Sequence, residues 1–86
     1  MLRRFWFKFE NVPPFSPLWL GCGVTGYDRS DALQLLAGTV FAKYPELKVD
    51  SVIEDVDVRS LDVGHVLPNM GVPAVRGVWF PLGYIT

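Results

Sequence analysis

Cysteine and histidine are almost absent from this chain of 86 residues, which contains one of each, Cys22 and His65. A single cysteine excludes an internal disulfide bond and is typical of proteins from a reducing compartment. One cysteine and one histidine also supply too few ligands for a structural zinc site. We therefore expect no metal, no cofactor and a cytoplasmic location.

Long apolar runs are missing as well. Lys8 and Glu10 interrupt the aromatic stretch near the N-terminus, which therefore lacks the apolar core of a signal peptide. The sequence contains no apolar run of the roughly 18 residues that a membrane span requires. The net charge is −1, so the chain has no general attraction for nucleic acid or for an anionic membrane. We expect neither as a partner.

Apolar and aromatic residues, in contrast, are abundant. Hydrophobic residues make up 50% of the chain and include six phenylalanines, three tryptophans and three tyrosines, a composition that excludes disorder. The length fits one domain, residues 1–86, with a single core. One helix and a few strands cannot easily bury so much apolar surface, so we expect part of it to lie at an interface.

The strongest periodic signal lies in residues 27–44. Apolar side chains recur there at the i, i+3, i+4, i+7 spacing of one face of an α-helix. Asp28 and Ser30 stand where an N-cap is needed, and Pro45 ends the helix. Gly38 is unfavourable inside a helix unless a neighbour packs closely against it. The predicted buried stripe consists of Leu33, Leu36, Ala37, Val40, Phe41 and Tyr44.

Four segments have the composition of β-strands. Arg4–Glu10 alternates strictly, with three phenylalanines on one face and Trp6 among charged residues on the other. The other three predicted strands are Leu18–Val24, Val52–Arg59 and Val75–Phe80. The order β-β-α-β-β predicts an α+β two-layer sandwich, in which one amphipathic helix packs on one face of a four-stranded, mostly antiparallel sheet. The uncovered face is then a second place for dimerisation.

The segment Gly21–Gly26 has the G-x-G-x-x-G spacing of phosphate-binding turns and lies between a predicted strand and a helix. However, Asp28 and Asp31 place negative charge where a phosphate would bind, and the chain lacks the strands of a dinucleotide-binding domain. The preferred interpretation is a strand and a turn whose glycines allow a bulky group to approach closely.

His65 lies in the segment Ser60–Ala74, which has no clear period, and loops of this length are often functional or interfacial. An imidazole can transfer protons near neutral pH, and it could pair with the Cys22 thiol while Asp62 or Asn69 orients the ring. The simpler interpretation is that His65 holds the loop through backbone hydrogen bonds. We prefer it because no motif supplies a nucleophile together with an oxyanion hole.

Two charged patterns allow further alternatives. Asp55 and Asp57 share a predicted strand face with Arg59, and paired carboxylates can bind a divalent cation, although the spacing does not match an EF-hand. A partly paired acidic stripe is the preferred interpretation. The basic and aromatic alternation in Arg4–Glu10 could stack single-stranded bases, but the basic positions are few.

From these features we predict a small non-catalytic protein-interaction module that forms a homodimer through an aromatic surface or binds another protein. Tryptophan and arginine are the usual anchors of interface cores. The alternative is a small enzyme or small-molecule-binding protein whose pocket lies between the Ser60–Ala74 loop and the Gly21–Gly26 turn and uses His65, Cys22 and Asp62. The predicted binding residues are Trp6, Trp19, Trp79, His65, Asn69 and Arg76.

Overall fold

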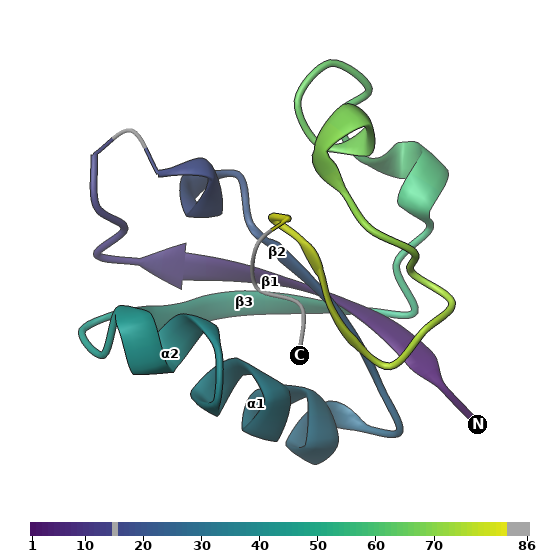
Figure 1. The fold of residues 1–86 in the computed structure, drawn as a ribbon, viewed down its shortest axis with the longest axis horizontal. Helices are drawn as coiled ribbons and strands as arrows, with labels where there is room; N and C mark the ends of the chain where they lie inside the picture. Colours follow the sequence, from purple (N-terminus) through teal and green to yellow (C-terminus); the bar gives the residue numbers. More distant parts are fainter. Residues whose placement is uncertain (15, 83–86) are drawn as a thin grey trace.

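The computed structural model describes residues 1–14 and 16–82. These residues form an antiparallel sheet with the strand order β3-β1-β2-β4 and two helices that pack on one of its faces (Figure 1). The α+β fold predicted from the sequence is therefore confirmed. The elements are β1 (Arg3–Glu10), β2 (Cys22–Gly26), α1 (Arg29–Ala37), α2 (Val40–Lys43), β3 (Lys48–Glu54) and β4 (Gly77–Phe80).

The helical segment consists of two successive helices rather than one continuous helix. Asp28 caps α1, and its Oδ1 accepts a hydrogen bond of 2.8 Å from the backbone N–H of Asp31. Gly38 closes α1, and the Thr39 hydroxyl donates to the Leu35 carbonyl at 2.7 Å before α2 begins at Val40. Gly38 is thus a C-cap on the surface and does not accommodate a close neighbour.

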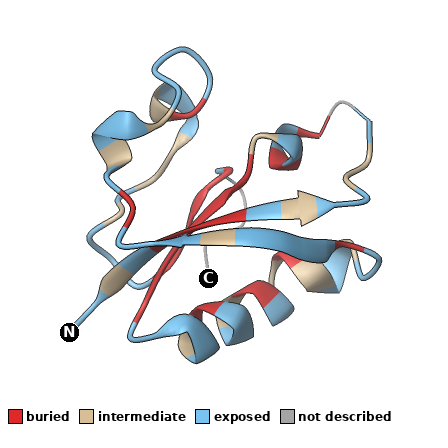
Figure 2. Cartoon of the chain, turned by 180° about the vertical axis from the view of Figure 1, so that it is seen from behind, coloured by how far each residue is buried: buried red, intermediate tan, exposed pale blue. Residues whose placement is uncertain are grey.

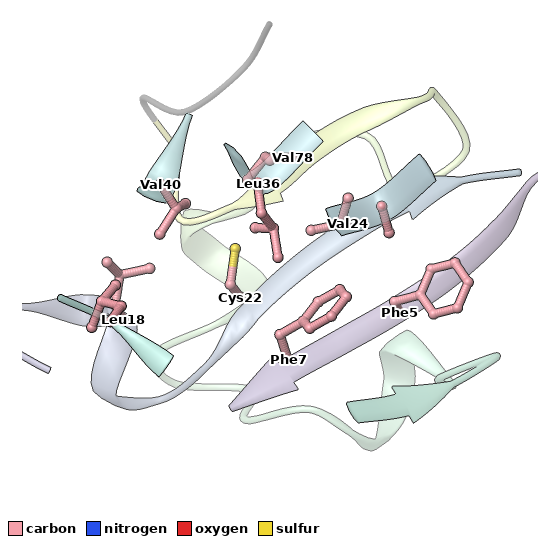
Figure 3. Packing of buried hydrophobic residues seen from close by; sticks show 10 residues of the cluster. Phe5, Phe7, Leu18, Cys22, Val24, Leu36, Val40 and Val78 are labelled. Carbon is pink, nitrogen blue, oxygen red and sulfur yellow. The ribbon is translucent and has the colours of Figure 1, made fainter. Parts of the chain in front are cut away.

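The first core cluster lies between the sheet and the helices (Figure 3). Ala32, Leu36 and Val40 are fully buried and succeed one another at intervals of four residues. The expected stripe was correct at Leu36 and Val40, and Phe41 and Tyr44 pack against its edge. The expectation was wrong for Leu33 and Ala37, which are exposed. The sheet contributes Phe5, Phe7, Cys22, Val24 and Val78 to this cluster.

A second core cluster covers part of the opposite face of the sheet. Residues 56–70, green in Figure 1, fold back over that face after β3. Val56 and Val66 are buried there against Trp6, whose ring centroid lies 5.9 Å from that of Trp79 and 5.5 Å from that of Phe80. The face that we expected to be open is therefore partly closed by this irregular segment (Figure 2).

A β-bulge in β4 allows this arrangement. Gly23 pairs with Phe80 and Val24 pairs with Val78, so Trp79 is the extra residue on β4. Because of the bulge, Trp79 and Phe80 both join the second cluster, whereas Val78 faces the helices.

The strand boundaries differ from those expected. Instead of a strand from Leu18, a 3-10 helix forms at Pro17–Trp19, with the Ser16 hydroxyl accepting from the Leu18 N–H at 3.2 Å. β3 begins earlier than expected and ends before Asp55, whose φ of 56° lies in the left-handed region. β4 begins at Gly77 rather than Val75.

Within residues 1–14 and 16–82, none of the helices has the length and apolar character needed to cross a membrane.

Candidate functional site

The expected aromatic surface does not form. The fractional exposure of Trp6 is 3% and that of Trp79 is 2%, because both side chains belong to the second core cluster. Trp19 alone of the three is exposed, at 70%, on the 3-10 helix that precedes β2. With Trp6 buried, the outer face of β1 also lacks the accessible ring that base stacking requires.

The two buried tryptophans explain the glycine spacing. A Cβ atom at Gly21 would overlap the indole of Trp6, and one at Gly23 would overlap the indole of Trp79. Gly21 also has a φ of 132°, a backbone angle that residues with a side chain rarely adopt. These glycines therefore let bulky rings pack directly on the sheet, as the preferred interpretation predicted. The segment does not form a phosphate-binding turn.

Cys22 and His65 do not meet. Cys22 is fully buried in the cluster between the sheet and the helices, where burial raises the pKa of its thiol. His65 is exposed on the segment that covers the opposite face, next to Val66. Because the sheet separates the two side chains, the proposed thiol–imidazole pair is excluded.

Asp62 organises the loop around His65. Its Oδ1 accepts backbone hydrogen bonds from Gly64 at 2.8 Å and from His65 at 3.1 Å, and its Oδ2 lies 3.1 Å from the imidazole Nδ1. The hydrogen bond from the Gly64 N–H, followed by that from the His65 ring, lowers the pKa of Asp62. The Asn69 Nδ2 donates to the His65 carbonyl at 2.9 Å. These contacts build a turn and supply no second reactive group.

Asp55 and Asp57 lie beyond the end of β3 rather than on one strand face. Arg3 Nε donates to Asp55 Oδ1 at 2.9 Å, and Arg59 Nε donates to Asp57 Oδ1 at 3.3 Å. The pKa of each carboxyl is lowered, first by the hydrogen bond from its own arginine. Among the described residues, no group of three or more histidine, cysteine, aspartate or glutamate side chains is placed to hold a metal ion.

An apolar hollow of about 220 Å³ lies beside β4, the strand at one edge of the sheet. Its lining includes the buried Trp79 together with Val72 and Val75, which are 64% and 62% exposed. Sequence reasoning missed both valines as surface residues, because it placed Val72 in the Ser60–Ala74 loop and Val75 at the start of the last strand, whereas β4 begins only at Gly77. The described residues that line it are Gly71, Val72, Val75, Arg76, Gly77, Val78 and Trp79.

Arg76 forms the polar rim of this hollow. Its Nε donates to Asp31 Oδ2 at 2.9 Å, and its guanidinium carbon lies 5.7 Å from the ring centroid of the exposed Tyr27. The Tyr27 N–H also donates to Asp31 Oδ2, at 2.9 Å. The hydrogen bond from Arg76 is the main cause that lowers the pKa of Asp31 to about 2. The rim is therefore held in place from the first turn of α1.

A second hollow, of about 290 Å³, is lined by Leu2, Arg3, Arg4, Thr25, Asp55, Pro73 and Ala74. It lies between the end of the Ser60–Ala74 loop and the Gly21–Gly26 segment, where the alternative prediction placed a pocket. Neither His65 nor Cys22 lines it. Comparison of the chain with protein-family models, with curated proteins and with solved structures finds no significant match.

Proposed function

We propose that this protein is a small non-catalytic interaction module that self-associates through the apolar hollow beside β4. The observation that carries the proposal is the exposure of Val72 and Val75, at 64% and 62%, next to a hollow that reaches the buried Trp79. Apolar side chains around a cavity, with tyrosine and arginine at the margin, have the anatomy of an interface core and its rim.

A second copy of the chain is a suitable occupant. Two copies related by a twofold axis present the same surface to each other, so each copy offers both exposed valines and a hollow that can receive an apolar side chain. Contact removes Val72 and Val75 from water, and the Tyr27–Arg76 pair then lies at the edge of the buried area.

The sheet edges offer less support for association through backbone pairing. β3 carries a bulge at Asp50 and charged residues at Lys48 and Glu54, features that protect an edge strand from pairing. β4 is short, and its Trp79 carbonyl already accepts a hydrogen bond from the Gly71 N–H. These features support a side-chain interface. We also propose a cytoplasmic location, because the chain contains a single cysteine.

Sedimentation equilibrium at micromolar concentration tests this proposal. We expect the wild-type chain to form a dimer, and we expect Val75→Asp to weaken the dimer by about tenfold or more, because a charge would be buried at the interface centre.

Val63→Asp is the matched control, because Val63 is also largely exposed, at 71%, but does not line the hollow. This variant should dimerise as the wild type does. A monomeric wild type, or equal weakening by both substitutions, would show that the hollow is not the interface.

A further inference from the structure

Arg3 and Arg4 begin β1 and have different surroundings. Arg3 is held by Asp55, with a second hydrogen bond of 2.7 Å from Nη2 to Oδ2, and it also reaches Glu54 at 3.3 Å. Arg4 pairs across the sheet with Thr25, on the face that carries Trp6. Among the described residues, no carboxylate lies within ion-pair distance of Arg4. Its guanidinium is therefore available to a ligand.

The charge of Arg4 extends into the second hollow. After the hydrogen bond from Arg3, the positive charges of Arg3 and Arg4 also contribute to the lowered pKa of Asp55. Among the described residues, the ionisable side chains that line the hollow are Arg3, Arg4 and Asp55, which together have an excess of one positive charge. Such a lining favours a ligand with a single negative charge.

Thr25 fixes the wall of this hollow. Its hydroxyl donates to the Pro73 carbonyl at 2.6 Å and accepts from the Trp79 Nε1–H at 3.0 Å. Since Thr25 is buried with both bonds made, it ties the chain at Pro73 and Ala74 to the strand that pairs with Arg4. The hollow is thus formed by a fixed part of the fold and not by side chains alone.

We propose that this hollow binds a small organic monocarboxylate, with the carboxylate on the guanidinium of Arg4. A guanidinium matches a carboxylate in charge and in its planar, bidentate geometry. Leu2, Pro73 and Ala74 provide apolar contact for the carbon chain of the ligand. The volume of about 290 Å³ restricts the ligand to a small molecule. None of the described residues lines both this site and the hollow beside β4, so the proposal does not depend on self-association.

Titration of the ¹⁵N-labelled protein with butyrate, followed by amide chemical shifts at constant ionic strength, tests the site. We expect saturable shifts at the amides of Thr25 and Ala74. Arg4→Gln should weaken butyrate binding by about tenfold, since it removes the charge-assisted hydrogen bonds. Lys8→Gln removes a positive charge further along the same face of β1, outside the hollow, and should leave binding unchanged.

Asp55→Asn should change the affinity for butyrate in the opposite direction from Arg4→Gln. It removes the negative charge from the lining, and asparagine tolerates the φ of 56° at this position, so butyrate should bind several-fold more tightly. This variant decides the question if Arg4→Gln fails to fold. Inorganic phosphate is the competing probe. Absent shifts at the hollow, equal effects of Arg4→Gln and Lys8→Gln, weaker binding by Asp55→Asn, or phosphate binding as tight as butyrate binding would each overturn the proposal.

Discussion

At the scale of single residues, Gly21 and Gly23 have the clearest structural roles. The sequence indicated that a bulky group approaches these glycines, but it could not identify Trp6 and Trp79 as those groups. The bulge in β4 places Phe80 on the same face as Trp79, and an extra residue of this kind leaves no mark in the local alternation. An interface role for Trp79 was expected wrongly because residues 56–70 cover this face, a contact between distant segments that the local pattern does not show.

Gly23→Ala should destabilise the fold by roughly 1–3 kcal/mol, because the added methyl group overlaps the buried indole of Trp79. Gly38→Ala is the control. Its Cβ meets no atom closer than 3.9 Å and its φ is −84°, so this change should be neutral or stabilising by up to about 1 kcal/mol. Urea unfolding midpoints measure both effects, and a similar loss in the two variants would contradict the close packing at Gly23.

Asp31 should make stability depend on acid pH. Its pKa of about 2 in the folded state lies below the ordinary value of 3.8, so the unfolded state binds the proton more readily. The stabilisation is therefore fully present above pH 3.8 and is lost as the pH falls towards 2. Urea midpoints of the wild type and Asp31→Asn should converge over this range. Gln34→Ala, which changes no ionisable group at an exposed position on α1, should keep a constant offset from the wild type, and a constant offset for Asp31→Asn would contradict the role of the Arg76 pair.

At the scale of elements, periodicity located the helical segment, and Asp28, one of its two candidate N-caps, caps α1, but periodicity misplaced part of the buried face. The stripe runs through Ala32, Leu36 and Val40, whereas the apolar Leu33 points outwards. The small Ala32 can lie against Gly26, where a Cβ atom on the glycine would be 3.2 Å from the Ala32 N atom. A hydrophobicity pattern gives greater weight to leucine than to alanine, so it could not find this contact.

Leu36→Ala should therefore cost about 2–5 kcal/mol, the usual range for a buried leucine, since Leu36 is fully buried in the first core cluster. Leu33→Ala should cost less than about 1 kcal/mol, because Leu33 is already exposed. Gln34→Ala, on the outer face, should be close to neutral or slightly favourable. Denaturant midpoints distinguish the three variants, and a large loss for Leu33→Ala would show that the helix is rotated from the position described.

The third predicted strand shows a different limit of sequence patterns. Val56 and Val58 resemble strand residues, but they belong to the segment after β3 and pack on the second core cluster. Asp55, with its φ of 56°, turns the chain out of the sheet before them. β-branched residues indicate a half-buried position in general, so composition alone could not separate strand from covering loop.

At the scale of the whole molecule, the fold class was predictable because one helical segment and four strands allow few arrangements. For the candidate sites, the sequence indicated only Arg76 and the region of the second hollow, because the linings of both hollows depend on contacts between distant segments. Thr25 meets Pro73, and Asp31 meets Arg76, across more than forty residues in both cases. These pairs create the walls and rims of the two hollows, and local patterns contain no information about them.

Residues 56–70 are attached to the sheet through the second core cluster. The sequence suggested His65 as the anchor, but its side chain is exposed and meets Asp62 within the same turn. Val66 is buried against the tryptophan cluster and is the better anchor. Val66→Ala should cost roughly 2 kcal/mol, from about 0.8 kcal/mol for each buried methylene-sized group removed plus a cavity term.

Hydrogen exchange across residues 60–74 separates the two anchors. In Val66→Ala, exchange should accelerate and tryptophan fluorescence should shift to the red, because water gains access to Trp6 and Trp79 when the covering segment opens. His65→Asn should leave both signals near those of the wild type, since the contacts of Asp62 with the backbone persist without the imidazole. Faster exchange in His65→Asn, together with unchanged exchange in Val66→Ala, would instead assign the anchoring role to the imidazole. In that case the turn around Asp62, and not apolar burial, would keep this face of the sheet closed.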